Sequence, residues 1–82
     1  MERKEQICLA SKLLKLSFED IEKNSTWLSE YNALYISVPI KGGDSLIVSN
    51  EGDVLYADSS VSYDLHLSEF LNGRRTPLEA FE

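Results

Sequence analysis

The chain has few of the residues that cross-link, ligate metals or catalyse. Its 82 residues include one cysteine, Cys8, and one histidine, His66. A single cysteine cannot form an internal disulfide, which excludes a small secreted scaffold held together by disulfide bonds. One cysteine and one histidine do not by themselves make a structural zinc site. We therefore expect no metal and no cofactor.

Long apolar runs and targeting signals are also missing. In the N-terminal segment MERKEQICLASKLLKL, Lys12 and Lys15 interrupt the apolar residues and no cleavage signature follows. No stretch approaches the roughly 18 apolar residues that a membrane span requires. The sequence thus predicts a cytoplasmic protein that does not bind membranes.

Positive charge is scarce in the second half of the chain. The net charge is −6, and all of it arises after Gly42, where only Arg74 and Arg75 are basic. The acidic residues of this half are Asp44, Glu51, Asp53, Asp58, Asp64, Glu69, Glu79 and Glu82. Nucleic-acid binding depends on Lys and Arg contacts to phosphates, so we expect no nucleic-acid partner. An acidic surface instead favours a basic protein partner.

What the chain does contain is clear hydrophobic periodicity. Residues 3–23 place six apolar side chains on one arc at helical spacing: Ile7, Ala10, Leu13, Leu14, Phe18 and Ile21. Ser17 is a candidate N-cap that would break this helix. Because the periodicity continues across Ser17, we predict one helix with at most a slight bend.

Three short segments alternate or cluster like β-strands. They cover residues 34–38, 45–49 and 54–57, and the turn sequences KGGD and NEGD separate them. Pro39 marks the end of the first strand or a sheet edge. Consecutive short strands favour an antiparallel meander. We expect Trp27, Leu28 and Tyr31 to tuck under this sheet.

The segment SVSYDLHLSEFLNG has two interpretations. As a helix it places Tyr63, Leu67, Phe70 and Leu71 on one face and ends at Gly73. As a strand, residues 61–67 alternate apolar and polar. The helix accounts for the whole segment, so we favour it.

The final TPLEAFE has the residues of a helix start: Thr76 as N-cap, Pro77 first and Glu79 third. The predicted fold is therefore a single α+β domain over residues 1–82. It has an N-terminal helix, a three-stranded antiparallel β-meander, a C-terminal helix and a short terminal helical turn, with the helices covering one face of the sheet.

No catalytic constellation stands out, and we predict that the chain is not an enzyme. Nucleotide-binding and nucleophile-elbow motifs are missing, and the spacing of the acidic residues in NEGDVLYAD does not match a calcium-binding loop. We expect His66 to pack at the core edge with its polar end in water.

The function favoured by composition is a small acidic regulator or inhibitor, of the immunity type, that docks on a basic protein partner. Four acidic residues on the predicted turns are candidate contacts, with two tyrosines as aromatic anchors. These partner-binding residues are Asp44, Glu51, Asp53, Tyr56, Asp58 and Tyr63.

Two alternatives remain open. The first is a self-associating structural domain, such as a homodimer, whose sheet face carries Tyr35, Ile47, Leu55 and Ala57. The second is a small anion or ligand binder in which Arg74, Arg75 and Thr76 contact an anion or a carboxylate at the start of the last helix. For the two arginines, we first expect an internal ion pair with an acidic residue of a sheet turn.

Overall fold

The computed structural model describes residues 2–38 and 43–81. The predicted strand end at Pro39, and Lys41 and Gly42 of the predicted KGGD turn, lie outside these residues. In chain order the elements are α1 (Arg3–Leu14), α2 (Phe18–Lys23), β1 (Ser25–Leu28), β2 (Ala33–Ser37), β3 (Ser45–Val48), β4 (Val54–Ala57), α3 (Tyr63–Leu71) and the 3₁₀ turn η1 (Leu78–Phe81).

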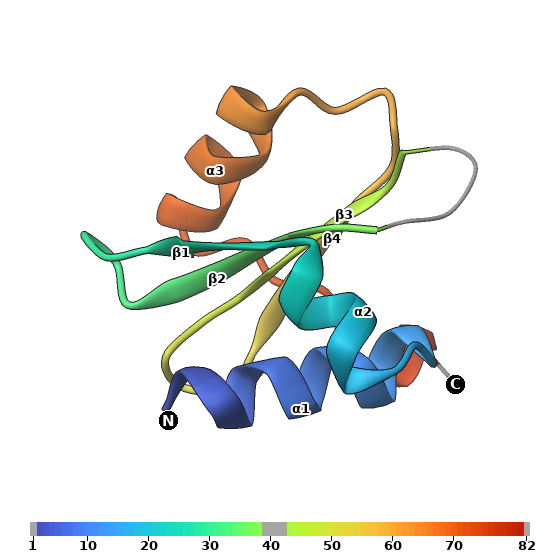
Figure 1. The fold of residues 1–82 in the computed structure, drawn as a ribbon. Coiled ribbons are helices and arrows are strands. Elements are labelled where there is room, and N and C mark those ends of the chain that lie inside the picture. The colour runs from blue at the N-terminus through green and yellow to red at the C-terminus, as the bar shows by residue number, and fades with distance from the viewer. Residues whose placement is uncertain (1, 39–42, 82) are drawn as a thin grey trace.

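The structure is a four-stranded antiparallel sheet with helices on both faces. Its strands lie in the order β1-β2-β3-β4, so each strand pairs with its neighbour in the chain. Figure 1 shows the sheet nearly edge-on, with α3 above it and α1 and α2 below. The α+β class and the antiparallel meander are confirmed, whereas the prediction that helices cover one face is wrong.

The fourth strand is β1, in the segment expected to tuck under the sheet. Trp27 and Leu28 instead pair with Leu34 and Ala33 of β2. The hairpin closes through Asn32, which has a φ of 51°. Asn tolerates this left-handed conformation better than most residues, so Asn32 is a turn signal in the sequence. The three-strand prediction missed it because the strand has only four residues and polar residues flank it.

The predicted single N-terminal helix is two helices. Lys15 adopts a left-handed conformation, with a φ of 57° and a ψ of 41°, and this ends α1. The Ser17 hydroxyl then accepts a hydrogen bond from the Asp20 backbone N–H at 3.1 Å, which caps α2. Ser17 therefore acts as the N-cap that its sequence suggested, and the continuous apolar phase reflects two helices covering one face.

Strand alternation divides the core between the two sheet faces. On the lower face, Ile7, Ala10 and Ile21 of the helices pack against one alternate set of strand residues, and the other set faces upward. The lower-face strand residues are Leu34, Ile36, Leu46, Val48 and Val54. On the upper face, Phe70 of α3 packs against Ala33, Ile47 and Leu55. Every residue of β3 is buried, as expected for an inner strand with both faces covered.

The helix interpretation of the ambiguous segment is confirmed. Ser62 caps α3 by accepting from the Leu65 backbone N–H at 3.3 Å. The helix ends with Gly73 at a φ of 90°, and the N–H groups of Gly73 and Arg74 bond back to the carbonyls of Phe70 and Glu69. This is the Schellman arrangement, in which glycine is favoured because it adopts positive φ without steric cost.

Gln6 fastens α1 to one end of the sheet. Its side chain is fully buried, and Nε2 lies 3.0–3.1 Å from the carbonyl oxygens of Asn32, Val48 and Ser49. Three surrounding carbonyls require the amide nitrogen in this position, because the opposite amide orientation would oppose oxygen to oxygen. The Oε1 atom is buried without a protein partner. Gln6 thus joins a helix to two different strand ends.

We expect Gln6→Leu to lower the free energy of unfolding by about 1–3 kcal/mol, because buried carbonyls lose their donor. Removing the buried, unpartnered Oε1 stabilises the fold and partly offsets this loss, which keeps the net decrease within this range. Lys4→Leu on the exposed side of the same helix is the matched control and should change stability by at most about 0.5 kcal/mol. Urea unfolding measures both, and equal stability of the two variants would contradict the anchoring role.

Candidate partner-binding surface

The structure distributes the predicted contact residues over three places. Asp44 and Asp58 lie at one end of the β3–β4 hairpin, because their neighbours Ser45 and Ala57 are partners in the strand register. Glu51 and Asp53 lie in the turn at the other end, separated by about 13 Å of strand. The remaining two residues are the tyrosines.

Tyr56 and Tyr63 lie on opposite faces of the sheet. Tyr56 packs against the lower core cluster beside Phe81, with ring centroids 5.9 Å apart. Tyr63 begins α3 on the upper face, where its ring meets Tyr35 edge-to-face at 4.8 Å. The two rings therefore cannot anchor one flat patch.

Asp44, Tyr56 and Asp58 form a cluster that we name the acidic end. The Tyr56 hydroxyl donates a hydrogen bond to Asp44 Oδ2. Asp58 Oδ1 accepts from the backbone N–H of Ser60 at 2.9 Å and also from its hydroxyl. Neither carboxylate lies within ion-pair distance of a Lys or Arg in residues 2–38 and 43–81. The acidic end thus holds two oriented carboxylates that no described cation neutralises.

Hydrogen bonding sets the ionisation of this cluster. The bond to Asp44, followed by burial, raises the pKa of Tyr56 to about 12, so this phenol stays protonated as a donor. The hydroxyl and backbone N–H of Ser60 lower the pKa of Asp58 below its usual value of 3.8. Asp58 therefore stays negatively charged throughout the neutral range.

The opposite hairpin end is organised by Ser49. Its hydroxyl accepts from the backbone N–H groups of Glu51 and Asp53 at 3.1 and 3.2 Å. Asp53 also pairs with Arg75 at 2.9 Å. Partial burial alone would raise the pKa of Asp53, but the hydrogen bonds from Ser49 and Arg75 and the charge of Arg75 outweigh it and lower the pKa. Asp53 therefore carries a compensated charge, unlike Asp44 and Asp58.

The two adjacent arginines have different environments. Arg74 pairs with Glu69 of α3 at 3.1 Å, and its side chain is 70% exposed. Arg75 is 29% exposed. Besides Asp53, it contacts the Phe70 ring, with the guanidinium carbon 4.0 Å from the centroid, and donates to the Phe70 carbonyl at 2.8 Å. Arg75 thus makes the expected pairing with a sheet turn, whereas Arg74 pairs with a helix.

Thr76 joins the sheet instead of capping a helix in isolation. Its backbone N–H donates to the Val54 carbonyl at 2.7 Å, and its hydroxyl accepts from the Tyr56 N–H at 2.9 Å. The following turn is 3₁₀, with Ala80 N–H bonded to the Pro77 carbonyl at 3.0 Å. All three predicted anion-contact residues, Arg74, Arg75 and Thr76, therefore make internal hydrogen bonds.

The sheet face suggested for self-association is occupied within the monomer. Ile47 is fully buried, and Leu55 and Ala57 are 8% and 7% exposed. Leu55 and Ile47 belong to the cluster that Phe70 of α3 covers. Tyr35 is half-buried against the same cluster, so within the monomer this face packs against α3.

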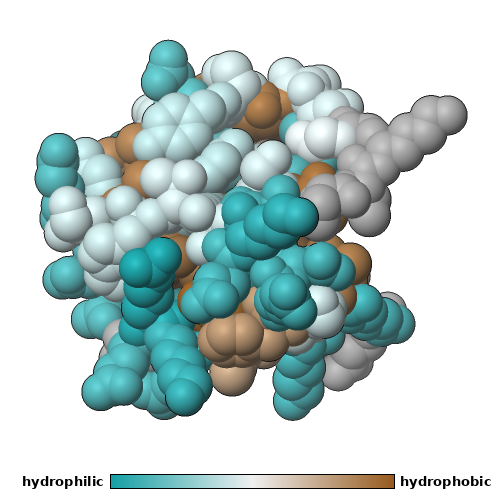
Figure 2. Space-filling model, in the orientation of Figure 1, coloured by the Kyte–Doolittle hydropathy of each residue, from teal (hydrophilic) through white to brown (hydrophobic). Residues whose placement is uncertain are grey.

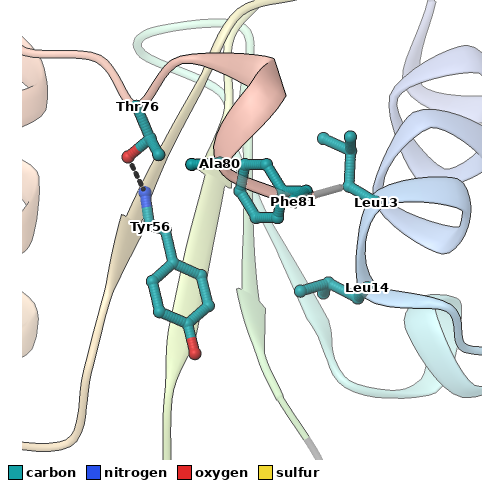
Figure 3. Close-up of a pocket in the computed structure, with 6 residues that line it drawn as sticks. All are labelled: Leu13, Leu14, Tyr56, Thr76, Ala80 and Phe81. Carbon is teal, nitrogen blue, oxygen red and sulfur yellow. Dashed lines mark hydrogen bonds between the residues drawn. The ribbon is translucent and has the colours of Figure 1, made fainter.

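An apolar hollow lies next to the acidic end. It has a volume of about 410 Å³ and shares Tyr56 with the acidic end. In Figure 3, Phe81 of the terminal turn lies toward Leu13 and Leu14 of α1, and Ala80 lies on the side of Tyr56. Tyr56 was a predicted contact residue, whereas the helical periodicity marked Leu13 and Leu14 as ordinary core positions and nothing in the sequence set Ala80 and Phe81 apart. A hollow beside charged groups is the usual form of a docking pocket for an apolar side chain.

His66 is buried, contrary to the expectation that its polar end faces water. Nδ1 lies 2.9 Å from the Ser45 hydroxyl, and Nε2 lies 2.8 Å from the Leu55 carbonyl. The carbonyl can only accept, so Nε2 carries the proton and Nδ1 accepts from Ser45. Serine beside histidine resembles a nucleophile and base, but both side chains are buried, with 4% of Ser45 and 0% of His66 exposed. This pair instead ties α3 to β3 and β4.

Two further kinds of feature bear on function: metal-ligating clusters and membrane-spanning helices. In residues 2–38 and 43–81, no group of three or more His, Cys, Asp or Glu side chains is placed to hold a metal ion. No helix in the same residues has the length and apolarity needed to cross a bilayer. Comparisons with protein families, curated sequences and solved structures gave no significant match.

We predict that stability falls as the pH drops below about 6.5, because burial lowers the pKa of His66 beneath its usual 6.5. Between the two pKa values the unfolded chain binds a proton that the folded chain does not, which costs up to about 1.4 kcal/mol per pH unit. The lowered carboxylate pKa values of Asp53 and Asp58 act only at more acidic pH. Urea unfolding across this range measures the effect, and His66→Gln should flatten it.

The single histidine also allows a direct check by NMR titration of its imidazole. An imidazole that titrates at or above pH 6.5 in the folded protein would contradict the prediction.

The adjacent arginines provide a second prediction and its control. Arg75→Leu should lower the free energy of unfolding by about 1–2 kcal/mol, because it removes the hydrogen bonds to Asp53 and the Phe70 carbonyl. Arg74→Leu removes only an exposed ion pair and should cost less than about 0.5 kcal/mol. Thermal or urea unfolding compares the two. A larger loss for Arg74→Leu would contradict the anchoring role of Arg75.

Proposed function

We propose that this chain is a small non-catalytic binding protein, a regulator or inhibitor of the immunity type, that docks its acidic end on the basic surface of a protein partner. The supporting observation is the pair Asp44 and Asp58, which lie side by side and lack a neutralising cation in the described chain. Internal ion pairs engage both arginines of the second half.

Preorganisation makes the acidic end suited to docking. Tyr56 and Ser60 hold the two carboxylates by hydrogen bonds, so less side-chain freedom is lost when a partner Lys or Arg binds. Negative potential also accelerates association with a basic surface. Both effects favour recognition by charge and shape.

The hollow beside Tyr56 supplies the apolar part of such an interface. Hot spots combine a desolvated apolar anchor with surrounding polar contacts that exclude water. The hollow of about 410 Å³ accommodates one large side chain, and the acidic end lies at its Tyr56 side. A partner that presents an apolar side chain next to Lys or Arg fits this arrangement.

The test begins with affinity purification of the tagged protein from its native host at low salt. The recovered partner is then titrated against Asp44→Asn/Asp58→Asn. Loss of two steering charges should weaken affinity about tenfold or more, mainly through a slower association rate. Raising the salt concentration should reduce the difference between variant and wild type.

The matched control is Glu2→Gln/Glu5→Gln, which removes the same charge from α1. This helix end lies near Ser49, at the other end of the hairpin. Its affinity should stay within about threefold of the wild type. Failure to recover a stoichiometric partner, or equal affinity for both double variants, would refute the proposal.

A further inference from the structure

The two edges of the sheet differ in their exposure to a partner strand. Thr76 covers the edge of β4, where it bridges Val54 and accepts from the Tyr56 N–H. The edge strand β1 pairs with β2 on one side, and its other side faces no strand in residues 2–38 and 43–81. An uncovered edge presents backbone donors and acceptors that can pair with another chain.

The register identifies which groups of β1 face outward. The Ser37 N–H donates to the Asn24 carbonyl at 3.0 Å, so this opposed pair lies at a hydrogen-bonded position. Hydrogen-bonded positions alternate along an antiparallel ladder, and the next one is Thr26. The N–H and C=O groups of Ser25 and Trp27 therefore point away from β2, toward the open edge.

A hollow of about 240 Å³ adjoins this edge, and we name it the β1 hollow. Leu28, Glu30, Tyr31, Tyr63 and Leu67 contribute to its lining. Tyr31 and Tyr63 are unusually exposed for large side chains, at 38% and 42%. Domains that bind an added strand combine an open strand edge with pockets that receive alternate side chains of that strand.

Surface character also sets this region apart. Figure 2 shows strongly hydrophilic side chains gathered over α1 and α2, whereas the surface at the level of β1 and α3 is mostly of intermediate hydropathy. Tyrosine, serine and threonine give this intermediate value and desolvate more readily than charged groups.

Charge distinguishes between possible occupants of the edge. Three acidic residues are close in the chain to β1 or to the residues that line its hollow: Glu22, Glu30 and Asp64. The one basic residue next to β1 in the chain is Lys23. A second copy would bring the same acidic groups and a further net charge of −6. A basic segment would instead find complementary charges.

We propose that the outer edge of β1 binds an extended segment of a protein partner as an added strand, with lysine or arginine near Glu30 and one apolar side chain in the β1 hollow. The basic character of the partner rests on the proposed function. The strand addition rests separately on the open edge and on the hollow. The partner thus contacts this protein by backbone pairing as well as by charge.

The probe is a synthetic amidated peptide that alternates lysine with valine and leucine. Trp27 is the only tryptophan of the chain and lies on the edge itself, so its fluorescence reports binding. Hydrogen exchange followed by NMR should show the Ser25 and Trp27 amides protected about tenfold or more by saturating peptide. Replacing lysine by glutamate in the peptide should abolish binding.

Backbone pairing is isolated by N-methylating alternate residues of the same peptide. Two lost backbone hydrogen bonds should weaken binding about tenfold or more, although charge and apolar content are retained. Tyr63→Ser should weaken binding about fivefold, because it removes an aromatic wall of the β1 hollow. Leu65→Ser, similarly exposed on another side of α3, is the matched control and should bind as the wild type does.

Three results would overturn the proposal. The first is that the N-methylated peptide binds with the same affinity as the unmodified peptide. The second is that peptide binding protects only amides of the acidic end. The third is that sedimentation shows a dimer in which the β1 amides are protected. The first two leave the acidic end as a docking surface and reject the added strand. Conversely, if Asp44→Asn/Asp58→Asn leaves native-partner affinity unchanged but the β1 amides are protected, the acidic end fails and the strand addition stands.

Discussion

Burial of β3 on both faces is the constraint on which the rest of the structure depends. An inner strand with four buried residues requires a layer of helix on each side. A chain of this size meets that requirement by dividing its helices, with α1 and α2 below the sheet and α3 above. The His66 imidazole then links α3 to the carbonyl of Leu55 and to Ser45, so the upper layer is held by polar contacts as well as by Phe70.

This arrangement explains why the candidate recognition features lie at the ends and edges of the sheet. The apolar residues of the strands are used internally on both faces, which leaves the sheet ends and edges as places for recognition. At the ends, turns carry acidic residues because Asp and Ser satisfy tight backbone geometry. At the edges, Thr76 covers part of β4, whereas no described strand covers the outer side of β1. The acidic end and the open edge of β1 are therefore located in different parts of the molecule.

Much of the fold was predictable from periodicity. The strand 54–57 and the helix that ends at Gly73 follow from local pattern and turn chemistry, and the structure has both. The break near Ser17 was visible as an N-cap but was outweighed by continuous apolar phase, which a left-handed Lys15 preserves. The strand β1 was missed because four residues carry too little alternation to be separated from a loop.

The candidate site was less predictable, because it depends on contacts between distant residues. Sequence identified Asp44 and Asp58 as acidic turn residues, but only the register between β3 and β4 places them together. Tyr63 and Tyr56 looked equivalent and are separated by the sheet. Burial of His66 could not be inferred either, since its partners are Ser45 and a backbone carbonyl 11 residues away.

Residues 72–77, which connect α3 to the terminal turn, also bear on how far the sheet can be extended. Thr76 provides a single rung of pairing on β4, and Pro77, which lacks an N–H, cannot add another donor there. Open-ended fibres require two complementary edges on every subunit, because each subunit must receive one strand and offer another. With one edge blocked, growth by edge pairing stops after a single addition. Thr76 and Pro77 thus limit pairing at the β4 edge, and β1 is the edge of the described sheet that faces no other strand.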